Sequence, residues 1–274
     1  MLGLTAGALA LLGAGIERWA AARDRRRIPM PGQHVPIGET LLHASLLGRR
    51  RDPAQPVIVM DGGLVRGSLA WTEVVAALGP GWLILVFDRA GHNWSTRATG
   101  PRSAEANLAD QREMLAGLHL APPWLLVAQD TAAPIAQMHA ARHPSEVAGL
   151  VLVDPLSGPL AAELLGSGFA RSLRWKVPVA RIGLWRLARH LRRRSPRPSE
   201  PAEPLWQSAK DLSACRAELA SLVRDVAAAE AAPPPRQPCR IVAGATPAAV
   251  AQAILEVAEQ TALPQPRGHV PHGA

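Results

Sequence analysis

An aspartate stands at a strand-to-helix corner in the stretch "WLLVAQDTAAPIAQ", residues 124–137. Residues 124–129 are apolar enough for a buried strand, and the residues after Asp130 begin a helix, so Asp130 lies on the sharp turn between them. A carboxylate presented on such a turn can act as a nucleophile. Aspartate is also a favoured N-cap of helices. Two interpretations therefore stay open for Asp130, a nucleophile or a helix cap.

Further carboxylates follow apolar stretches of the same kind, which predicts a sheet that gathers them at one edge. Apolar runs separated by helices of about 10–15 residues indicate parallel strands that are covered on both faces. Ligands of such sheets bind at the carboxyl ends of the strands, although carboxylates there also cap helices. The four runs are "PVIVMD" (56–61), "WLILVFD" (82–88), "WLLVAQ" (124–129) and "AGLVLVD" (148–154), and the carboxylates at their ends are Asp61, Asp88, Asp130 and Asp154.

The alternation stops after Asp154, and helical patterns fill the chain until strand character returns at "PCRIVAGA", residues 238–245. Within this interval, residues 171–194 combine leucines at helical spacing with many arginines, which is typical of a basic amphipathic helix. A helical insertion between two strands of one sheet is the plan of a lid over an active site. We therefore expect an N-terminal hydrophobic segment with a basic flank (1–27), a core domain (28–155), a helical cap or lid (156–237) and the C-terminal part of the core (238–274).

The chain begins with an uncharged apolar run, residues 1–16, which is followed by "ERWAAARDRRR". A spanning helix usually needs about 20 apolar residues, so this run has to extend to Ala22 to cross a membrane. Basic residues directly after it favour keeping that side in the cytoplasm. We expect an N-terminal membrane anchor with the domain on the cytoplasmic side, and the alternative is a cleaved signal of a secreted protein. The basic stretch 171–194 is a second expected membrane contact.

Charge and composition argue against several classes of function. The formal net charge is +8 over 274 residues, but the arginine clusters are not interleaved with the aromatic platforms of nucleic-acid binders, so no nucleic-acid partner is expected. The two cysteines, Cys215 and Cys239, show no metal-ligand spacing. The sequence has neither a His/Cys cluster nor a phosphate-binding G-x-x-x-x-G-K motif, so we expect no metal and no cofactor.

Three stretches in order resemble the α/β-hydrolase superfamily: "VIVMDGGLVRGSLAW", "VFDRAGHNWST" and "AARHPSEVAGLVLVDP". They look like its oxyanion loop, its D-x-x-G-x-x-x-S loop, and the helix and strand after its nucleophile. The resemblance covers nearly the whole chain and is closest to a bacterial group with an N-terminal membrane anchor. It implies the α/β-hydrolase fold, a mostly parallel sheet with helices on both faces and an inserted helical cap.

In this superfamily the nucleophile stands in a G-x-S-x-G turn, which corresponds here to residues 128–132 with alanine in place of both glycines. Aspartate at the serine position resembles haloalkane dehalogenases and epoxide hydrolases. The dehalogenase-type turn usually has tryptophan next, where this chain has Thr131. By resemblance, the backbone N–H groups of Thr131 and Gly63 form the oxyanion hole, and Asp154 is the catalytic acid.

The catalytic histidine of the superfamily lies after the last strand. The chain ends "PRGHVPHGA", so the resemblance gives this role to His272, or else to His269, while the same ending also looks like a core cut before that histidine. The resulting hypothesis is a hydrolase in which Asp130 forms a covalent ester with a small apolar substrate, such as a haloalkane, an epoxide or an ester-like compound. The alternative is a catalytically degenerate member of the superfamily that acts as a membrane-associated binding module.

Overall fold

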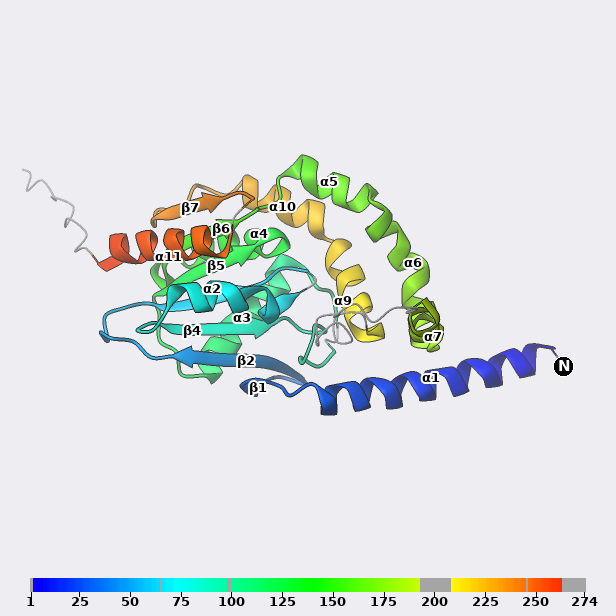
Figure 1. Ribbon diagram of the computed structural model, residues 1–274. Helices are drawn as coiled ribbons and strands as arrows, with labels where there is room; N and C mark the ends of the chain where they lie inside the picture. Colours follow the sequence, from blue (N-terminus) through cyan, green and yellow to red (C-terminus); the bar gives the residue numbers. More distant parts are fainter. Residues whose placement is uncertain (1, 65, 98–99, 193–207, 245, 263–274) are drawn as a thin grey trace, which may run out of the picture.

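A seven-stranded sheet forms the centre of the protein (Figure 1). The computed structural model describes all residues except 1, 65, 98–99, 193–207, 245 and 263–274. The strand order is β1-β2-β4-β3-β5-β6-β7; β2 pairs antiparallel with both β1 and β4, and the other pairs are parallel. The strands are β1 (Gln33–Ile37), β2 (Thr40–Gly48), β3 (Val57–Asp61), β4 (Leu83–Asp88), β5 (Trp124–Gln129), β6 (Val147–Val153) and β7 (Cys239–Val242).

The central strands β3, β4, β5 and β6 are buried along almost their whole length. A strand that has helices on both faces is apolar on both, so valine, isoleucine and leucine follow one another in it without alternation. The four apolar runs of the sequence coincide with these four strands to within two residues. The predicted α/β class with a mostly parallel sheet is confirmed.

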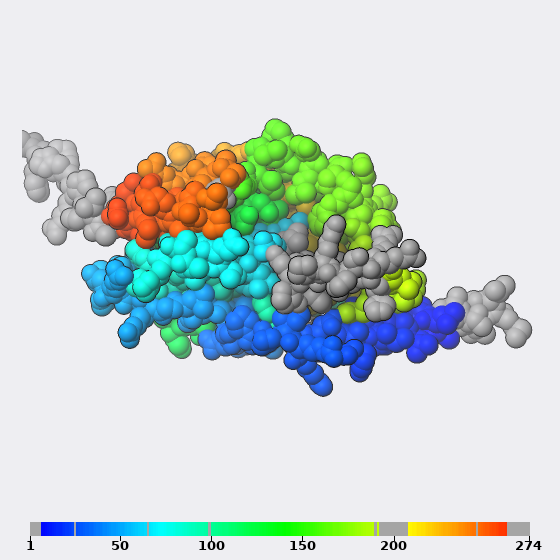
Figure 2. Space-filling model, in the orientation of Figure 1, coloured from blue at the N-terminus to red at the C-terminus, as the bar shows by residue number. Residues whose placement is uncertain are grey.

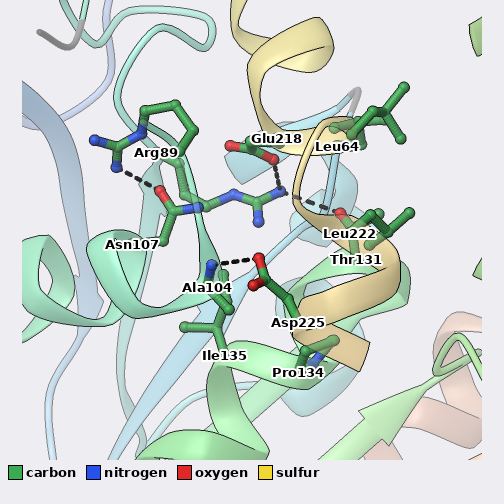
Figure 3. A pocket seen from close by; sticks show the side chains of 12 residues that line it. Leu64, Arg89, Ala104, Asn107, Thr131, Pro134, Ile135, Glu218, Leu222 and Asp225 are labelled. Atoms are coloured by element: carbon green, nitrogen blue, oxygen red, sulfur yellow. Dashed lines mark hydrogen bonds and ion pairs between the residues drawn. The ribbon is translucent and has the colours of Figure 1, made fainter. Parts of the chain in front are cut away.

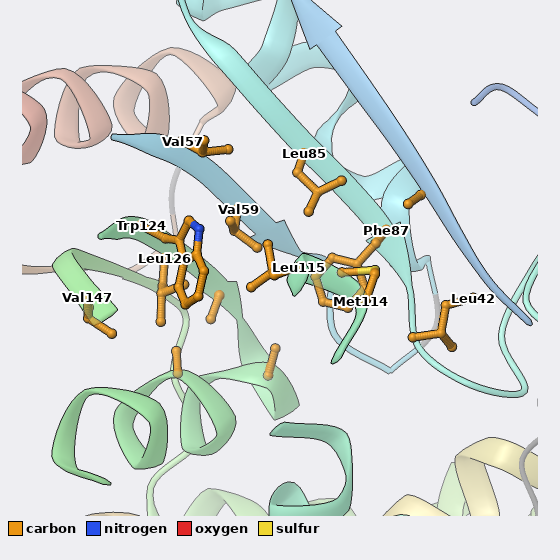
Figure 4. Close-up of a cluster of buried hydrophobic side chains, with 14 of the residues drawn as sticks. Leu42, Val57, Val59, Leu85, Phe87, Met114, Leu115, Trp124, Leu126 and Val147 are labelled. Carbon is orange, nitrogen blue, oxygen red and sulfur yellow. The ribbon is translucent and has the colours of Figure 1, made fainter. Parts of the chain in front are cut away.

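Four helices cover the two faces of the sheet and complete the core. The helices α3 (Ala104–Gly117) and α4 (Ala133–Arg142) contribute Met114, Leu115 and a row of alanines to the cluster in Figure 4, where they face Val59 and Leu126. The helices α2 (Thr72–Leu78) and α11 (Pro247–Ala262) pack against the other face. Full burial of one such side chain contributes about 1.5–3 kcal/mol, so these two clusters hold the sheet in place.

A second set of helices lies between β6 and β7 along the chain and has an apolar cluster of its own. Leu173, Leu212 and Val226 are buried in that cluster together with Leu64, which comes from the loop after β3. These inserted helices thus pack over the carboxyl end of the sheet (Figure 1). The domain boundaries at residues 27, 155 and 237 stay a prediction. The helices are α5 (Gly158–Gly166), α6 (Gly168–Arg181), α7 (Leu184–Arg192), α9 (Ala209–Leu219) and α10 (Leu222–Glu230).

The N-terminal segment forms one helix, α1 (Leu2–Arg27), which runs along the base of the molecule beside α7 (Figure 2). The Arg186 guanidinium of α7 donates from Nε to Glu17 Oε2 at 2.8 Å and also pairs with Asp24. Glu17 is buried by this contact. On the same side of α1, Gly13 lies against the backbone carbonyl of Ile182, where a Cβ would have no room. α1 therefore docks on the inserted helices through ion pairs and a close backbone contact.

The predicted membrane anchor, and with it the predicted cytoplasmic-side localisation at a membrane, is wrong. Among the described residues, no helix combines the length and the apolar character that crossing a membrane requires. The uncharged run of α1 ends at Glu17, short of the about 20 residues that a bilayer needs. Residues 19–22, which would have to extend the apolar run, lie between Glu17 and Asp24. Both acids form ion pairs with the Arg186 guanidinium.

Candidate active site

Asp130 occupies a tight turn where β5 ends and the chain enters α4 through the short 3-10 helix Asp130–Ala132. Its φ is +44°, a left-handed conformation that only a few per cent of residues other than glycine adopt. Ala128 and Ala132 on either side are almost completely buried, so larger side chains would not fit beside the turn. Pro134 stands in the first turn of α4, where its missing N–H leaves no helical hydrogen bond broken.

The Asp130 carboxylate is held by the backbone that follows it. The N–H of Thr131 donates a hydrogen bond to Asp130 Oδ1. A helix N-cap would instead accept from the second or third residue of the helix, and neither the 3-10 helix nor α4 has a side-chain cap hydrogen bond. The helix-cap interpretation of Asp130 therefore lacks its defining contact.

Burial raises the pKa of Asp130 above its ordinary value of 3.8, although the carboxylate is partly exposed to solvent. The N–H and hydroxyl of Thr131 and the Arg89 guanidinium act in the opposite direction, and Glu218 adds to the increase. Desolvation thus outweighs the hydrogen bonds, which leaves a carboxylate that is less well solvated than one in water.

Gly63 meets the other side of the Asp130 carboxylate. A Cβ on Gly63 would lie 3.0 Å from both Cγ and Oδ1 of Asp130 and 2.9 Å from the Gln129 carbonyl oxygen. The φ of Gly63 is +71°, and its N–H donates to Asp61 Oδ1 at 3.2 Å. The structure thus brings Asp130, Thr131 and Gly63 together, but it directs the Gly63 N–H at Asp61 in place of Asp130.

We predict that Gly63→Ala slows reaction at Asp130 at least tenfold, because the new methyl group would displace the carboxylate from the Thr131 N–H. The matched control is Gly38→Ala, since Gly38 also has a positive φ of +52° but has nothing within 4 Å of an added Cβ. Both substitutions carry backbone strain of about 1–2 kcal/mol, so thermal unfolding separates this shared effect from the local clash. Equal reaction rates in both variants would show that contact with Gly63 does not position Asp130.

A buried cluster of charges, which the sequence did not reveal, lies next to this turn (Figure 3). Arg89 Nη2 lies 3.2 Å from Glu218 Oε2 and donates to Thr131 Oγ1 at 3.3 Å, while Arg89 Nε lies 3.6 Å from Asp61 Oδ1. His92 Nε2 lies 3.1 Å from Glu218 Oε1. Glu218 belongs to α9, so the cluster joins the inserted helices to the loop after β4 and to the residue after Asp130.

Burial and the Arg89 guanidinium shift the pKa values of the carboxylates in this cluster. Burial raises the pKa of Asp61, and Arg89 only partly opposes that effect. Burial alone would also raise the pKa of Glu218, but Arg89 and His92 outweigh it and lower the pKa below 4.5. The pKa values of the two carboxylates beside Arg89 thus shift in opposite directions, upward for Asp61 and downward for Glu218.

The space between these residues is narrow. Apolar side chains of Leu64, Ile135 and Leu222 line it together with Arg89 and Glu218, and it has room for about one water molecule. Glu218 Oε2 is buried and accepts no hydrogen bond within the described part of the chain. Half of the residues that line this space are polar or charged, and at this size it has no room for a ligand larger than water.

The predicted acid lies on the neighbouring strand end. Asp154 follows β6 with a φ of +46°, is exposed, and accepts from the Gly244 N–H at 2.6 Å. No hydrogen bond among the described residues joins it to Asp130. The predicted bases His269 and His272 lie outside the described residues, and the described histidines at 34, 43, 92 and 139 hydrogen-bond to groups other than Asp130 and Asp154.

The described residues include no group of three side chains that could hold a metal ion. The two cysteines are free thiols; Cys215 is buried and Cys239 is exposed. The groups next to the Asp130 carboxylate are the Thr131 N–H, which donates to it, and the ion pair between Arg89 and Glu218.

Comparison with known proteins places the chain in a family. The structure superposes on that of a protein from Pseudomonas aeruginosa described as a candidate epoxide hydrolase, with a TM-score of 0.62 and 16% identity over 84% of this chain and 95% of the other. It also superposes on the haloalkane dehalogenase DatA from Agrobacterium tumefaciens C58, with a TM-score of 0.60 and 16% identity over 84% of this chain and 96% of DatA.

The sequence is 26% identical over 113 residues to the uncharacterized protein YqjL of Bacillus subtilis (strain 168), which is 41% of this chain and 45% of YqjL. The chain spans less than half the length of the curated relatives that it matches. Residues 56–193, just over half of the chain, match the α/β hydrolase fold family. The predicted superfamily is thereby confirmed, and the chain belongs to the α/β-hydrolase fold family.

Proposed function

We propose that this protein is a hydrolase in which Asp130 attacks a small apolar substrate, a haloalkane or an epoxide, and forms a covalent ester. The observation that carries the proposal is the hydrogen bond from the Thr131 N–H to one oxygen of a carboxylate that stands on a positive-φ turn after β5. The structural similarity to hydrolases supports it at the level of the fold.

The two oxygens of Asp130 take different roles in this mechanism. Oδ2 attacks the electrophilic carbon; a carbon–halogen bond breaks and halide leaves, or an epoxide carbon–oxygen bond breaks and the alkoxide takes a proton from water. Oδ1, held by the Thr131 N–H, becomes the carbonyl oxygen of the ester. When water then attacks Cγ, negative charge develops on Oδ1, where the same N–H donor stabilises it.

Hydrolysis of the ester needs a base that removes a proton from water. We keep His272 as the proposed base and Asp154 as the acid that orients it, both as predictions from the family resemblance. Asp154 is exposed at the end of β6, the strand that pairs with β5. Its carboxylate is therefore accessible to a histidine on a loop after the last strand.

A second candidate function is a catalytically degenerate member of the family that binds a ligand without chemistry. Two contacts favour it: the Gly63 N–H is engaged by Asp61, and the ion pair between Arg89 and Glu218 closes the space beside Thr131 to about one water molecule. Both leave less of an oxyanion hole and less room for substrate than an active hydrolase needs.

The test is to trap the ester. We expect incubation with a panel of small haloalkanes and epoxides to add the mass of the alkyl or hydroxyalkyl group to the tryptic peptide 113–142, with fragmentation placing it on Asp130. His272→Gln should make the adduct accumulate, because ester hydrolysis is slowed and ester formation is not. Asp130→Asn is the control that should carry no adduct. No adduct across the panel in either the unmodified chain or His272→Gln would favour the second candidate.

A further inference from the structure

A second cavity lies away from Asp130, between α1, α6 and the start of α9, and is much larger than the space beside Thr131. Its volume is about 360 Å³, within the range of small-molecule sites. Four of the residues that line it are basic and come from four segments: Arg18 of α1, Arg97 of the loop after β4, Arg181 of α6 and Lys210 of α9.

The acid among the described residues that line this cavity, Glu17, is already paired. Glu17 receives two hydrogen bonds from Arg186, at 2.8 and 3.3 Å, and is buried. Asp211, in the first turn of α9, does not line the cavity but accepts from the Asn93 N–H at 2.7 Å and from Ser208. Within the described part of the chain, neither acid forms an ion pair with Arg18, Arg97 or Arg181.

Three guanidinium groups remain available to a ligand. Arg18, Arg97 and Arg181 are exposed, and none of them makes a hydrogen bond or ion pair with the described residues. Lys210 is fixed by contrast, since its Nζ donates to the carbonyl oxygens of Asn93 and Ser95 at 2.6 and 2.5 Å. The positive end of the α9 dipole adds to the potential, because Ser208 and Ala209 at its start also line the cavity.

We propose that this basic cavity binds a phosphate-bearing small molecule. Guanidinium groups pair with phosphate through two parallel hydrogen bonds, and groups that approach from α1, α6 and a loop suit a tetrahedral dianion better than a planar carboxylate. A bound dianion also relieves the repulsion between arginines that surround one cavity. α1 then has a role in the folded protein, since it supplies one wall of the site.

The experiment is calorimetric titration of the full chain with pyrophosphate and with inorganic phosphate. We expect saturable binding at one site and at least a tenfold weaker affinity in Arg97→Ala and in Arg181→Ala, because each loses a charge-assisted hydrogen bond. Arg174→Ala is the matched control: Arg174 is an exposed arginine of the same helix α6 that does not line the cavity. Thermal unfolding of each variant checks that the fold is kept.

A parallel titration with vesicles of phosphatidic acid, against vesicles of phosphatidylcholine, identifies the source of the phosphate. Binding of the free anions supports a soluble ligand, while binding of phosphatidic acid alone, lost in Arg97→Ala and Arg181→Ala, supports a headgroup as the ligand. Equal weakening in Arg174→Ala would mean diffuse attraction to a basic surface and would overturn the site. Absence of saturable binding to all probes would overturn it as well.

Discussion

Asp130→Asn should lower the turnover of haloalkanes and epoxides at least a thousandfold, on the order of the losses seen when a nucleophile is removed from other hydrolases. The amide has the shape of the carboxylate but no nucleophilic oxygen, so the ester cannot form. Asparagine tolerates positive φ as well as aspartate does, and the Thr131 N–H can still donate to its carbonyl oxygen. Halide release or diol formation measures the loss of turnover.

The unfolding free energy of Asp130→Asn should stay within about 1 kcal/mol of that of the unmodified chain. The substitution keeps the turn and removes a negative charge that is poorly solvated. Asp52→Asn, at an exposed aspartate remote from β5, serves as the control and should leave turnover unchanged. Full activity in Asp130→Asn would mean that any hydrolase activity of this chain uses another group.

Arg89→Met should lower the free energy of unfolding by about 3–5 kcal/mol, the usual result of removing one partner from a buried ion pair. Asp61 and Glu218 would then face each other in an apolar surrounding without the guanidinium that neutralises them. Methionine fills a similar length, so the effect comes from charge and not from an empty space. Urea unfolding at neutral pH measures it.

The double variant Arg89→Met with Glu218→Gln should recover part of that stability, because the second change removes one of the two stranded charges. Glu218→Gln alone should be destabilising, since Arg89 loses the carboxylate 3.2 Å from its Nη2 and His92 loses the one 3.1 Å from its Nε2. Additive losses in the double variant would contradict the ion pair between Arg89 and Glu218.

Much of the fold is predictable from sequence because its signals are local. The apolar runs that became β3 to β6 are continuous, and the turn residues after them are adjacent in the chain, so the strands and the place of Asp130 follow from short stretches. The neighbourhood of Asp130, Thr131 and Gly63 follows as well, since β3 and β5 are paired strands whose ends meet.

The charge cluster could not be found in this way. Glu218 and His92 are 126 residues apart, and a glutamate in a helix that also carries alanine and leucine has no local mark that tells a buried ion pair from a solvated face. The loop "VFDRAGHNWST" held part of the signal, because Arg89 and His92 directly follow the buried strand end at Asp88.

The apolar run and the basic residues after it predict a membrane anchor, and the contacts that the charged residues of α1 make are non-local. Glu17 and Asp24 look like the charged edge of an apolar run, but their partner Arg186 lies 169 and 162 residues away along the chain, respectively. Within the arginine-rich stretch 171–194, Arg186 pairs with Glu17 and Asp24 of α1, and the expected contact of this stretch with lipid stays a prediction.

Under the proposed function, the position of Glu218 on α9 couples substrate binding to electrostatic contacts. If α9 moves away to make room beside Thr131, Glu218 leaves both the Arg89 guanidinium, 3.2 Å away, and the His92 imidazole, 3.1 Å away. Each opening event thus exposes a cation and an anion to solvent at once. Dissolved salt favours separated charges, so a higher salt concentration should increase the rate at which an uncharged substrate binds.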